Sequence, residues 1–302
     1  PANPRAPGDW YPIENPSAPF YYLNASFLLK SACALKAGET LTLRYRVCVH
    51  PGRWDAAALR QASAQYNGGV SSAEAIHVLL LTGANNHAWK ETTAALTALF
   101  AQDPRFAVTV NDRPWEMKPA DLQGVKLVFS NWNTFGKKDD EKRAFEWSEA
   151  MRAAFLDWVR NGGGFFVLHS GGCLFYDWAA FQSLTGGAWE KETFHPKMQT
   201  FRVNIADTAH PVTRGMADFE TFDEPWQHIG NHNPNRHVLA TGVVAKENGG
   251  SGEPEPFAFV TELGQGRCFN LMLGHDAQAL SNAGCRTLVL RGAEWAASGE
   301  VR

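Results

Sequence analysis

Continuous apolar runs that end abruptly in polar loops constrain the fold of this chain most. Residues 76–81 (IHVLLL), 126–130 (KLVFS) and 165–168 (FFVL) show no regular polar alternation, which is typical of strands buried on both faces of a parallel sheet. Helically spaced apolar residues lie between them, at 91–101 and 145–159. Strands that alternate with helices in this order predict an α/β fold, with a mostly parallel sheet flanked by helices.

Other segments of the chain add further strands to this sheet. A short strand is expected at 106–110, and the later segments predict four more strands and a last helix. These segments are 200–205, 237–241, 257–262, 267–273 and, for the helix, 286–297.

The first 66 residues have a different pattern. Residues 1–20 are rich in proline and predict an extended, irregular arm, while residues 40–49 alternate with period two like a half-buried antiparallel strand. A short helix is expected at 54–66, and the small residues of 67–75 are typical of a linker. Such a short β-rich extension cannot close a core by itself.

Composition excludes several classes of function. Apolar residues make up 44% of the 302 residues and the net charge is −3, as in an ordinary globular protein. There is no basic run with interleaved aromatic residues and no apolar run of about 18 residues, so neither a nucleic-acid nor a membrane partner is expected. Five cysteines without CxxC spacing argue against a disulfide framework. The eleven Trp and nineteen Phe fit a thick core and also stacking on a sugar ring.

Polar residues that directly follow the buried strands mark the candidate site. Ligands of an open parallel sheet bind outside the carboxyl ends of its strands, so these loops share one rim. Side chains expected to bind or stack on a ligand there are Asn85, His87, Trp89, Asn131, Trp132, Asn133, Asp223 and Asp276. Side chains expected to take part in catalysis are His169, Ser170, Glu224 and His275.

A structural interpretation competes with a functional one for Asp223, Glu224 and His195. Asp223 and Glu224 could orient a histidine or bind sugar hydroxyls, or they could form a solvated turn. His195, before Pro196, is expected to be structural, in a turn whose loop could cover the site.

The turn FFVLHSGG resembles a nucleophile elbow. An apolar strand, a displayed residue and glycines form the sharp strand-to-helix turn that presents Ser or Cys in hydrolases. Here His169 or Ser170 occupies that position, depending on the register. Cys173 follows in or near the next helix and is a poor nucleophile candidate.

Four segments together resemble the ThuA-like family, which is tied to trehalose utilisation. They are TGANNHAWKETT, GGGFFVLHSGG, HPVTRGM followed by DFETFDE, and LGHDAQALSNAGCRTLVLRGAEWAA. The resemblance implies the class I glutamine-amidotransferase-like fold, a flavodoxin-like arrangement, over residues 76–298. In that fold the elbow carries Cys and a later loop carries His-x-Glu. This chain has His169 and Gly274-His275-Asp276 instead, so glutaminase chemistry is not expected.

A second resemblance concerns the N-terminal segment. FYYLNASFLLK and LKAGETLTLRYRVCVHPGRWD are similar to the C-terminal end of the PmoA-like family, a β-sandwich. The expected domains are thus 1–66 as the tail of a PmoA-like module, 67–75 as a linker and 76–298 as the ThuA-like domain. The remainder of the PmoA-like module is an expected partner.

The ThuA-like resemblance implies a bacterial enzyme of carbohydrate catabolism. Its substrate would be an oxidised sugar such as a 3-keto-glycoside, which it would isomerise or cleave as a hydrolase or lyase. A keto group acidifies the neighbouring C–H, and histidine is the base best matched to neutral pH. His169 and His275 are therefore the base and acid candidates. The alternative is a non-catalytic carbohydrate-binding or scaffolding module.

A divalent metal is a second hypothesis for the same rim. His87, His169, Glu224 and His275 provide nitrogen and oxygen ligands suited to Zn²⁺ or Mn²⁺. No HxH or HExxH spacing supports the site, so the fold would have to assemble it. A homo-oligomer is a further hypothesis, and the cytoplasm is favoured over the periplasm, which would require a removed leader.

Overall fold

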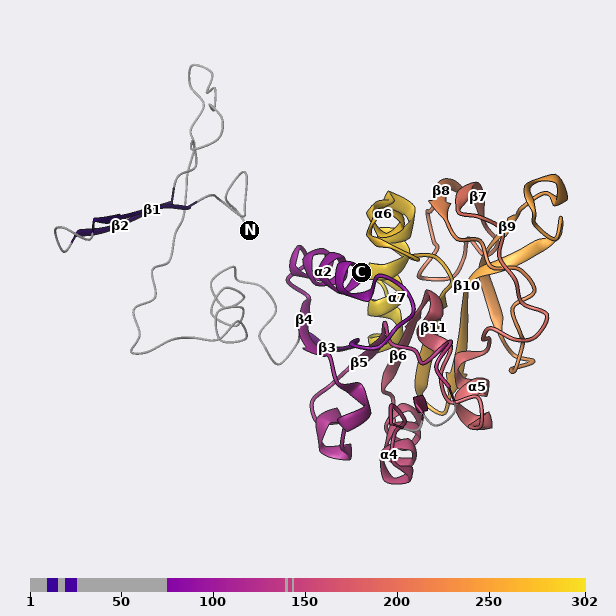
Figure 1. Cartoon of the computed structure of the whole chain (residues 1–302), viewed down its shortest axis with the longest axis horizontal. Helices are drawn as coiled ribbons and strands as arrows, with labels where there is room; N and C mark the ends of the chain where they lie inside the picture. Colours follow the sequence, from indigo (N-terminus) through magenta and orange to yellow (C-terminus); the bar gives the residue numbers. More distant parts are fainter. Residues whose placement is uncertain (1–9, 16–19, 26–74, 139–140, 143) are drawn as a thin grey trace, which may run out of the picture. The chain divides into compact units, whose positions relative to one another are not determined.

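The computed structural model describes residues 10–15, 20–25, 75–138, 141–142 and 144–302 (Figure 1). The chain divides into two units, Pro1–Ala73 and Glu74–Arg302. The expected strand at 40–49 and helix at 54–66 lie outside the described residues, as do Cys33 and Cys48.

The described part of the first unit is a two-stranded antiparallel sheet. β1 (Trp10–Asn15) pairs with β2 (Phe20–Ala25), with Trp10 opposite Ala25. The prediction of an irregular arm over residues 1–20 is therefore wrong for β1. In a two-stranded ladder both strands are edge strands, and an edge strand tolerates a proline such as Pro12.

The second unit is built on a nine-stranded mixed sheet of order β4-β3-β5-β6-β11-β10-β9-β7-β8. Its first five strands in this order are parallel, and the other four are antiparallel to their neighbours. The parallel strands are β3 (Ile76–Leu81), β4 (Phe106–Asn111), β5 (Leu127–Ser130), β6 (Gly164–Leu168) and β11 (Gly266–Leu271). The antiparallel strands are β7 (Gln199–Ile205), β8 (Phe219–Asp223), β9 (His237–Val243) and β10 (Pro254–Leu263).

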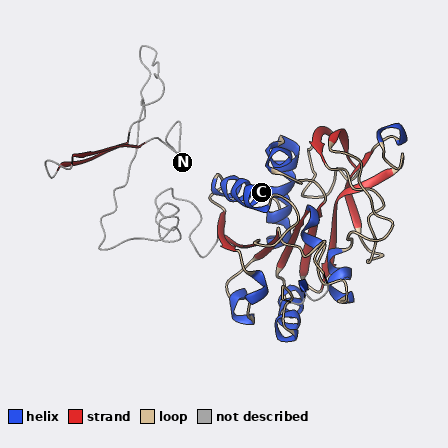
Figure 2. Cartoon of the chain, in the orientation of Figure 1, coloured by secondary structure: helices blue, strands red, loops and turns tan. Residues whose placement is uncertain are grey.

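Helices cover both faces of the parallel half (Figure 2). The helices are α2 (Trp89–Ala101), α4 (Glu149–Arg160), α5 (Ala179–Thr185), α6 (Ala277–Ser281) and α7 (Ala283–Ser298). Short 3₁₀ turns are η1 (Pro114–Glu116), η2 (Pro119–Leu122), η3 (His169–Gly172) and η4 (Lys246–Asn248).

Alternate residues of each buried strand reach two separate hydrophobic clusters. In β6, Phe166 and Leu168 pack in the cluster that holds the apolar residues of α2 and α7. Phe165 and Val167 pack in the cluster that holds those of α4 and α5. Both faces of the strand are thus buried, which explains its unbroken apolar run.

The expected α/β fold class is confirmed, with differences at element ends. α4 begins at Glu149 because the Ser148 hydroxyl accepts a hydrogen bond from the Met151 amide at 3.3 Å. α7 begins earlier than expected because Asn282 caps it. β8 was not predicted, since its segment reads as a polar turn. Among the described residues, no helix has the length and apolar character needed to cross a membrane.

Strand direction brings β8 to the same rim as the parallel strands. Four antiparallel steps separate β11 from β8, so the two strands run the same way. The residues after β8 therefore emerge at the same edge of the sheet as those after β11. Hydrogen bonds from the Gly274 amide (2.7 Å) and the His275 amide (3.2 Å) to the Asp223 carboxylate join the two ends.

Candidate functional site

The centre of the site is the carboxylate of Glu224, directly after β8. Imidazole rings from four different loops face it. They belong to His87, His169, His195 and His275. The Trp226 indole N–H also donates to Glu224 Oε2 at 2.9 Å. The expectation of one rim assembled from separate loops therefore holds for three of these histidines, and His195 joins them.

His169 lies at the elbow after β6, in the left-handed region with φ 47°. The Gly171 beside it is needed, because a Cβ there would lie 2.2 Å from the Ser130 carbonyl oxygen. His169 Nδ1 donates to the Met272 carbonyl oxygen at 2.8 Å, since a carbonyl oxygen only accepts. Its Nε2 lies 3.2 Å from Glu224 Oε2, another acceptor, so a hydrogen bond there requires the doubly protonated imidazolium.

The electrostatics of His169 agree with this hydrogen bonding. Burial opposes its charge, but the hydrogen bond to Glu224 and the charges of Asp223 and Glu224 outweigh burial and raise the pKa of His169. His169 is 3% exposed and both ring nitrogens are engaged. It therefore holds the Glu224 carboxylate in place, and its expected contact with a substrate as catalytic base is not supported by this geometry.

His87 is fixed by a polar network across the loops after β3, β5 and β6. Its Nδ1 lies 2.9 Å from Ser170 Oγ and 3.1 Å from Asn85 Oδ1. Asn133 Nδ2 donates to both of these oxygens, at 2.8 Å in each case. Ser170 Oγ is thus an internal partner of His87, and Nε2 of His87 points at Glu224 Oε2, 3.8 Å away.

His275 is positioned by the buried Asp223. The Asp223 carboxylate accepts backbone N–H groups from Gly274, His275 and Glu224, and it is fully buried. Both the solvated-turn interpretation and the binding of sugar hydroxyls are therefore wrong for Asp223. His275 Nε2 lies 3.8 Å from Glu224 Oε1.

The charges of this cluster follow from its burial. Burial opposes ionisation of Glu224, but the imidazoles of His169 and His87 hold the pKa of its carboxyl well below the usual range. Burial and the positive charge of His169 lower the pKa of His87 and of His275. The pKa shifts therefore favour the charged forms of Glu224 and His169 and the neutral forms of His87 and His275.

His195 was expected to be structural, and the geometry gives it a place in the site instead. Its Nδ1 lies 2.9 Å from the Pro196 carbonyl oxygen and 3.2 Å from Glu224 Oε1. Both oxygens only accept, so Nδ1 carries the proton and Nε2 keeps its lone pair. The side chain is 41% exposed, the most open imidazole around Glu224.

Several expected ligand-binding residues have other roles. Trp132 is fully buried against Trp147 and Phe175, so it cannot stack on a sugar. Asn131 donates to Thr92 Oγ1 at 2.9 Å and ties β5 to α2. Asp276 caps α6 by accepting from the Ala279 amide at 2.8 Å.

Trp89 starts α2 and is partly exposed, and its ring lies beside the Lys90 ammonium, 5.4 Å away.

The cysteines of the described residues offer no nucleophile. Burial raises the pKa of the Cys173 thiol to about 11, so it is protonated at neutral pH.

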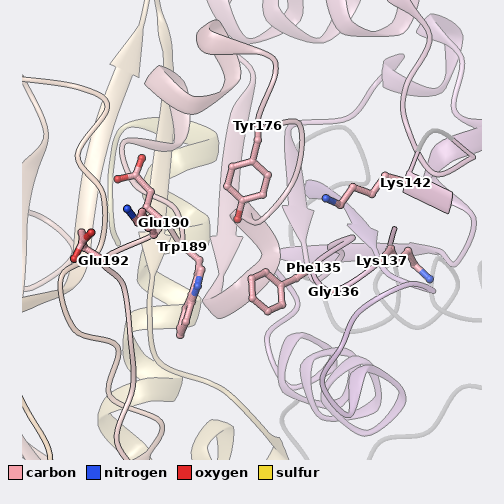
Figure 3. A pocket seen from close by; sticks show the side chains of 9 residues that line it. Phe135, Gly136, Lys137, Lys142, Tyr176, Trp189, Glu190 and Glu192 are labelled. Carbon is pink, nitrogen blue, oxygen red and sulfur yellow. The ribbon is translucent and has the colours of Figure 1, made fainter. Parts of the chain in front are cut away.

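A cavity of about 640 Å³ adjoins the cluster (Figure 3). The rings of Phe135, Tyr176 and Trp189 line it, with Lys137 and Lys142 on one side and Glu190 and Glu192 on the other. Phe135 and Tyr176 are 39% and 47% exposed. The Trp189 ring also lies 5.0 Å from Trp226 and 5.6 Å from His195, so it is shared between the cavity and the cluster.

No sequence pattern marks these aromatic residues. They lie in loops without periodicity, at 134–138, 173–178 and 186–198, and only the exposure of Phe135 and Tyr176 as large rings distinguishes them. The sequence likewise did not predict that His195 belongs to the site, because a His-Pro pair is also common in ordinary turns.

The family model described as ThuA, trehalose utilisation, matches residues 77–296. The chain belongs to the ThuA family. No curated protein matches it. Among solved structures, a ThuA-like protein from Parabacteroides merdae is 27% identical, with a TM-score of 0.66 over 75% of this chain and 91% of that one.

A ThuA-like protein from Bacteroides uniformis is 17% identical, with a TM-score of 0.56 over 83% of this chain and 97% of that chain, which shows a shared fold. The expected ThuA family and its α/β fold are thus confirmed for residues 77–296. The PmoA-like resemblance is not confirmed, and it rests mostly on residues outside those described.

Proposed function

We propose that this ThuA-family protein is an enzyme that acts on an oxidised sugar, with His195 as the group that transfers a proton. The observation that carries the proposal is the pair His195–Glu224. Nδ1 faces Glu224 Oε1 at 3.2 Å, and Nε2 has no hydrogen-bond partner among the described residues. A carboxylate that fixes the tautomer of an exposed imidazole is a recurrent acid–base arrangement in enzymes.

The reaction follows from what such a base can remove. A keto group acidifies the C–H beside it, and His195 Nε2 would accept that proton. Glu224 would stabilise the imidazolium that forms. Returning the proton to another carbon isomerises the sugar, and loss of a glycosidic oxygen at the neighbouring carbon cleaves a 3-keto-glycoside. His275 Nε2 lies 3.8 Å from Oε1, the same Glu224 oxygen that faces His195, and His275 is our candidate for assisting the departing oxygen.

The substrate class is supported by the aromatic cavity. Exposed rings at Phe135 and Tyr176 offer flat faces to the C–H face of a sugar, and the charged residues around them can bind hydroxyls. Trp189 connects this cavity with His195. The description of the family, trehalose utilisation, agrees with a substrate of two sugar rings.

The test is turnover of 3-keto-trehalose and 3-keto-glucosides, followed by mass spectrometry with and without divalent ions. His195→Ala is expected to lower kcat by about 10²–10⁴. The matched control is His237→Ala, an exposed histidine paired with Asp207 outside the cluster, which should retain the parent rate.

Two results would contradict the proposal in different ways. Turnover by His195→Ala at the parent rate would show that another group transfers the proton. Sugar binding without any turnover by the parent protein would favour the alternative, a non-catalytic carbohydrate-binding module.

A further inference from the structure

Two imidazoles and one carboxylate converge at the centre of the cluster. The nearest ligand atoms of His87, Glu224 and His275 all lie within 4.8 Å of one another. We propose that these three side chains bind a divalent transition-metal ion through His87 Nε2, His275 Nε2 and the Glu224 carboxylate. The inference rests on this geometry alone and does not depend on the sugar chemistry proposed above.

The distances fit metal ligands better than hydrogen bonds. His87 Nε2 and His275 Nε2 each lie 3.8 Å from a Glu224 oxygen, which is too long for a hydrogen bond. Bonds of about 2.1 Å around a tetrahedral ion place neighbouring ligand atoms about 3.4 Å apart. A small rotation of the two rings is therefore enough to close the three ligands around one ion.

Hydrogen bonds hold the His87 ring, the backbone of His275 and the Glu224 carboxylate, whereas Nδ1 of His275 has no hydrogen-bond partner among the described residues. Ser170 Oγ and Asn85 Oδ1 engage Nδ1 of His87 and leave Nε2 facing the space. The Asp223 carboxylate holds the backbone amide of His275. Partners of this kind orient metal ligands and are a regular feature of protein metal sites.

The Glu224 carboxylate is oriented in the same way. The Trp226 indole donates to Oε2 at 2.9 Å, and His169 Nε2 lies 3.2 Å from the same oxygen.

The set of donors decides the class of ion. Two histidines and one carboxylate are the ligands of catalytic zinc and of non-haem iron sites, with positions left for water or substrate oxygens. Because nitrogen donors predominate, Zn²⁺ should bind more tightly than Mn²⁺, and Mg²⁺ should bind weakly. As a metal ligand, His275 would not itself assist the departing oxygen, and the ion would supply that assistance as a Lewis acid.

The test is titration calorimetry of the chelator-treated protein with Zn²⁺, Mn²⁺ and Mg²⁺, without sugar. One equivalent of Zn²⁺ is expected to bind. His87→Ala and His275→Ala should each weaken it roughly 100-fold or more, because loss of even an outer partner costs 10–100-fold. Two matched controls, His237→Ala and His228→Ala, remove exposed histidines paired with Asp207 and Glu255 and should bind as the parent does.

Circular dichroism of each variant checks that it is folded, and Glu224→Gln provides a third variant that keeps the side-chain shape. X-ray absorption of the Zn²⁺ complex should show imidazole scattering from at least two histidines. Absence of stoichiometric Zn²⁺ binding by the folded parent would overturn the proposal, and so would Zn²⁺ affinity equal to that of the parent in both His87→Ala and His275→Ala. Because no substrate is present, neither result depends on whether the protein acts on sugars.

Discussion

At the scale of single residues, two adjacent carboxylates have opposite roles. Asp223 is the last residue of β8, is fully buried and accepts only backbone N–H groups. Glu224 is the next residue and faces the imidazoles. Burial raises the pKa of Asp223, whereas the imidazoles lower that of Glu224. Adjacent acidic residues in a sequence can thus differ completely in function once one of them belongs to a strand.

Replacement of Asp223 should therefore affect stability rather than remove a group that contacts the substrate. Asp223→Ala leaves three backbone N–H groups without their acceptor in a buried place, at a cost of about 2–4 kcal/mol. Urea denaturation measures this free energy of unfolding. Glu220→Ala, on the same strand but exposed, is the control and should change it by less than about 0.5 kcal/mol. Equal effects of the two substitutions would contradict the buried role of Asp223.

At the scale of elements, the elbow between β6 and η3 places His169 close to two other strands. The turn brings Gly171 against the carbonyl of Ser130 at the end of β5, and the Ser130 hydroxyl donates to the Gly171 carbonyl at 2.7 Å. This close approach fixes the position from which His169 and Ser170 reach Glu224 and His87.

Gly171→Ala should be much more harmful than Gly172→Ala. A Cβ at Gly171 would lie 2.2 Å from backbone oxygen, which cannot move without displacing β5, so a loss of about 1–3 kcal/mol is expected. At Gly172 the nearest atom is a Val167 methyl group at 3.1 Å, which can shift. Thermal unfolding of the two variants compares them directly. A Gly171→Ala protein as stable as the parent would show that the elbow is not tightly constrained.

A second element-scale feature joins the end of α2 to α7. Arg105 bonds to Asp103 at 2.6 Å and to the buried Glu294 of α7 at 2.6 Å. Burial opposes ionisation of Asp103, but hydrogen bonds from Arg105 outweigh it and lower its pKa. A carboxyl whose folded pKa is lowered stabilises the protein at neutral pH, and this stabilisation is lost as the pH falls through the folded pKa.

The stability difference between the parent and Asp103→Asn should therefore depend on pH. We expect about 1 kcal/mol near neutral pH, since the pair is partly exposed, and a clearly smaller difference at about pH 3, below the ordinary pKa of an aspartate. Denaturant titrations at several pH values measure this. Asp157→Asn removes an exposed partner of Arg160 and should show little difference at either pH. A constant difference for Asp103→Asn across this range would rule out the ionic contribution.

At the scale of the whole molecule, the second unit contains the site and both hydrophobic clusters. All residues of these clusters lie between Ile76 and Val301. Three predictions concern more than this unit. They are the PmoA-like module, a remainder of that module as a partner, and a homo-oligomer, and all three stay predictions.

Because both hydrophobic clusters of the described residues are built from this unit, residues 75–302 produced alone should fold. The expected result is the same melting temperature and near-ultraviolet circular dichroism as the 302-residue chain, and the same Zn²⁺ stoichiometry. A lower melting temperature or loss of the near-ultraviolet signal would show that the first 74 residues contribute to the stability of this unit.

The sequence by itself determined the parallel half of the sheet and the rim. Buried strands such as β6 have unbroken apolar runs because both of their faces are covered, and the direction of parallel strands places the loops of His87, His169 and His275 at one edge. Local pattern is sufficient for this, because it reflects strand burial and chain direction.

Only the tertiary structure decided what those loops do. β8 joins the sheet four strands away from β11 and still returns to the same rim, so Glu224 and Asp223 acquired their roles through long-range pairing. The same holds for Trp132, which is in the core, and for His195, which faces Glu224. Whether a strand-end side chain points into a core or into a site depends on neighbours distant in the sequence, and residue type and spacing do not contain that information.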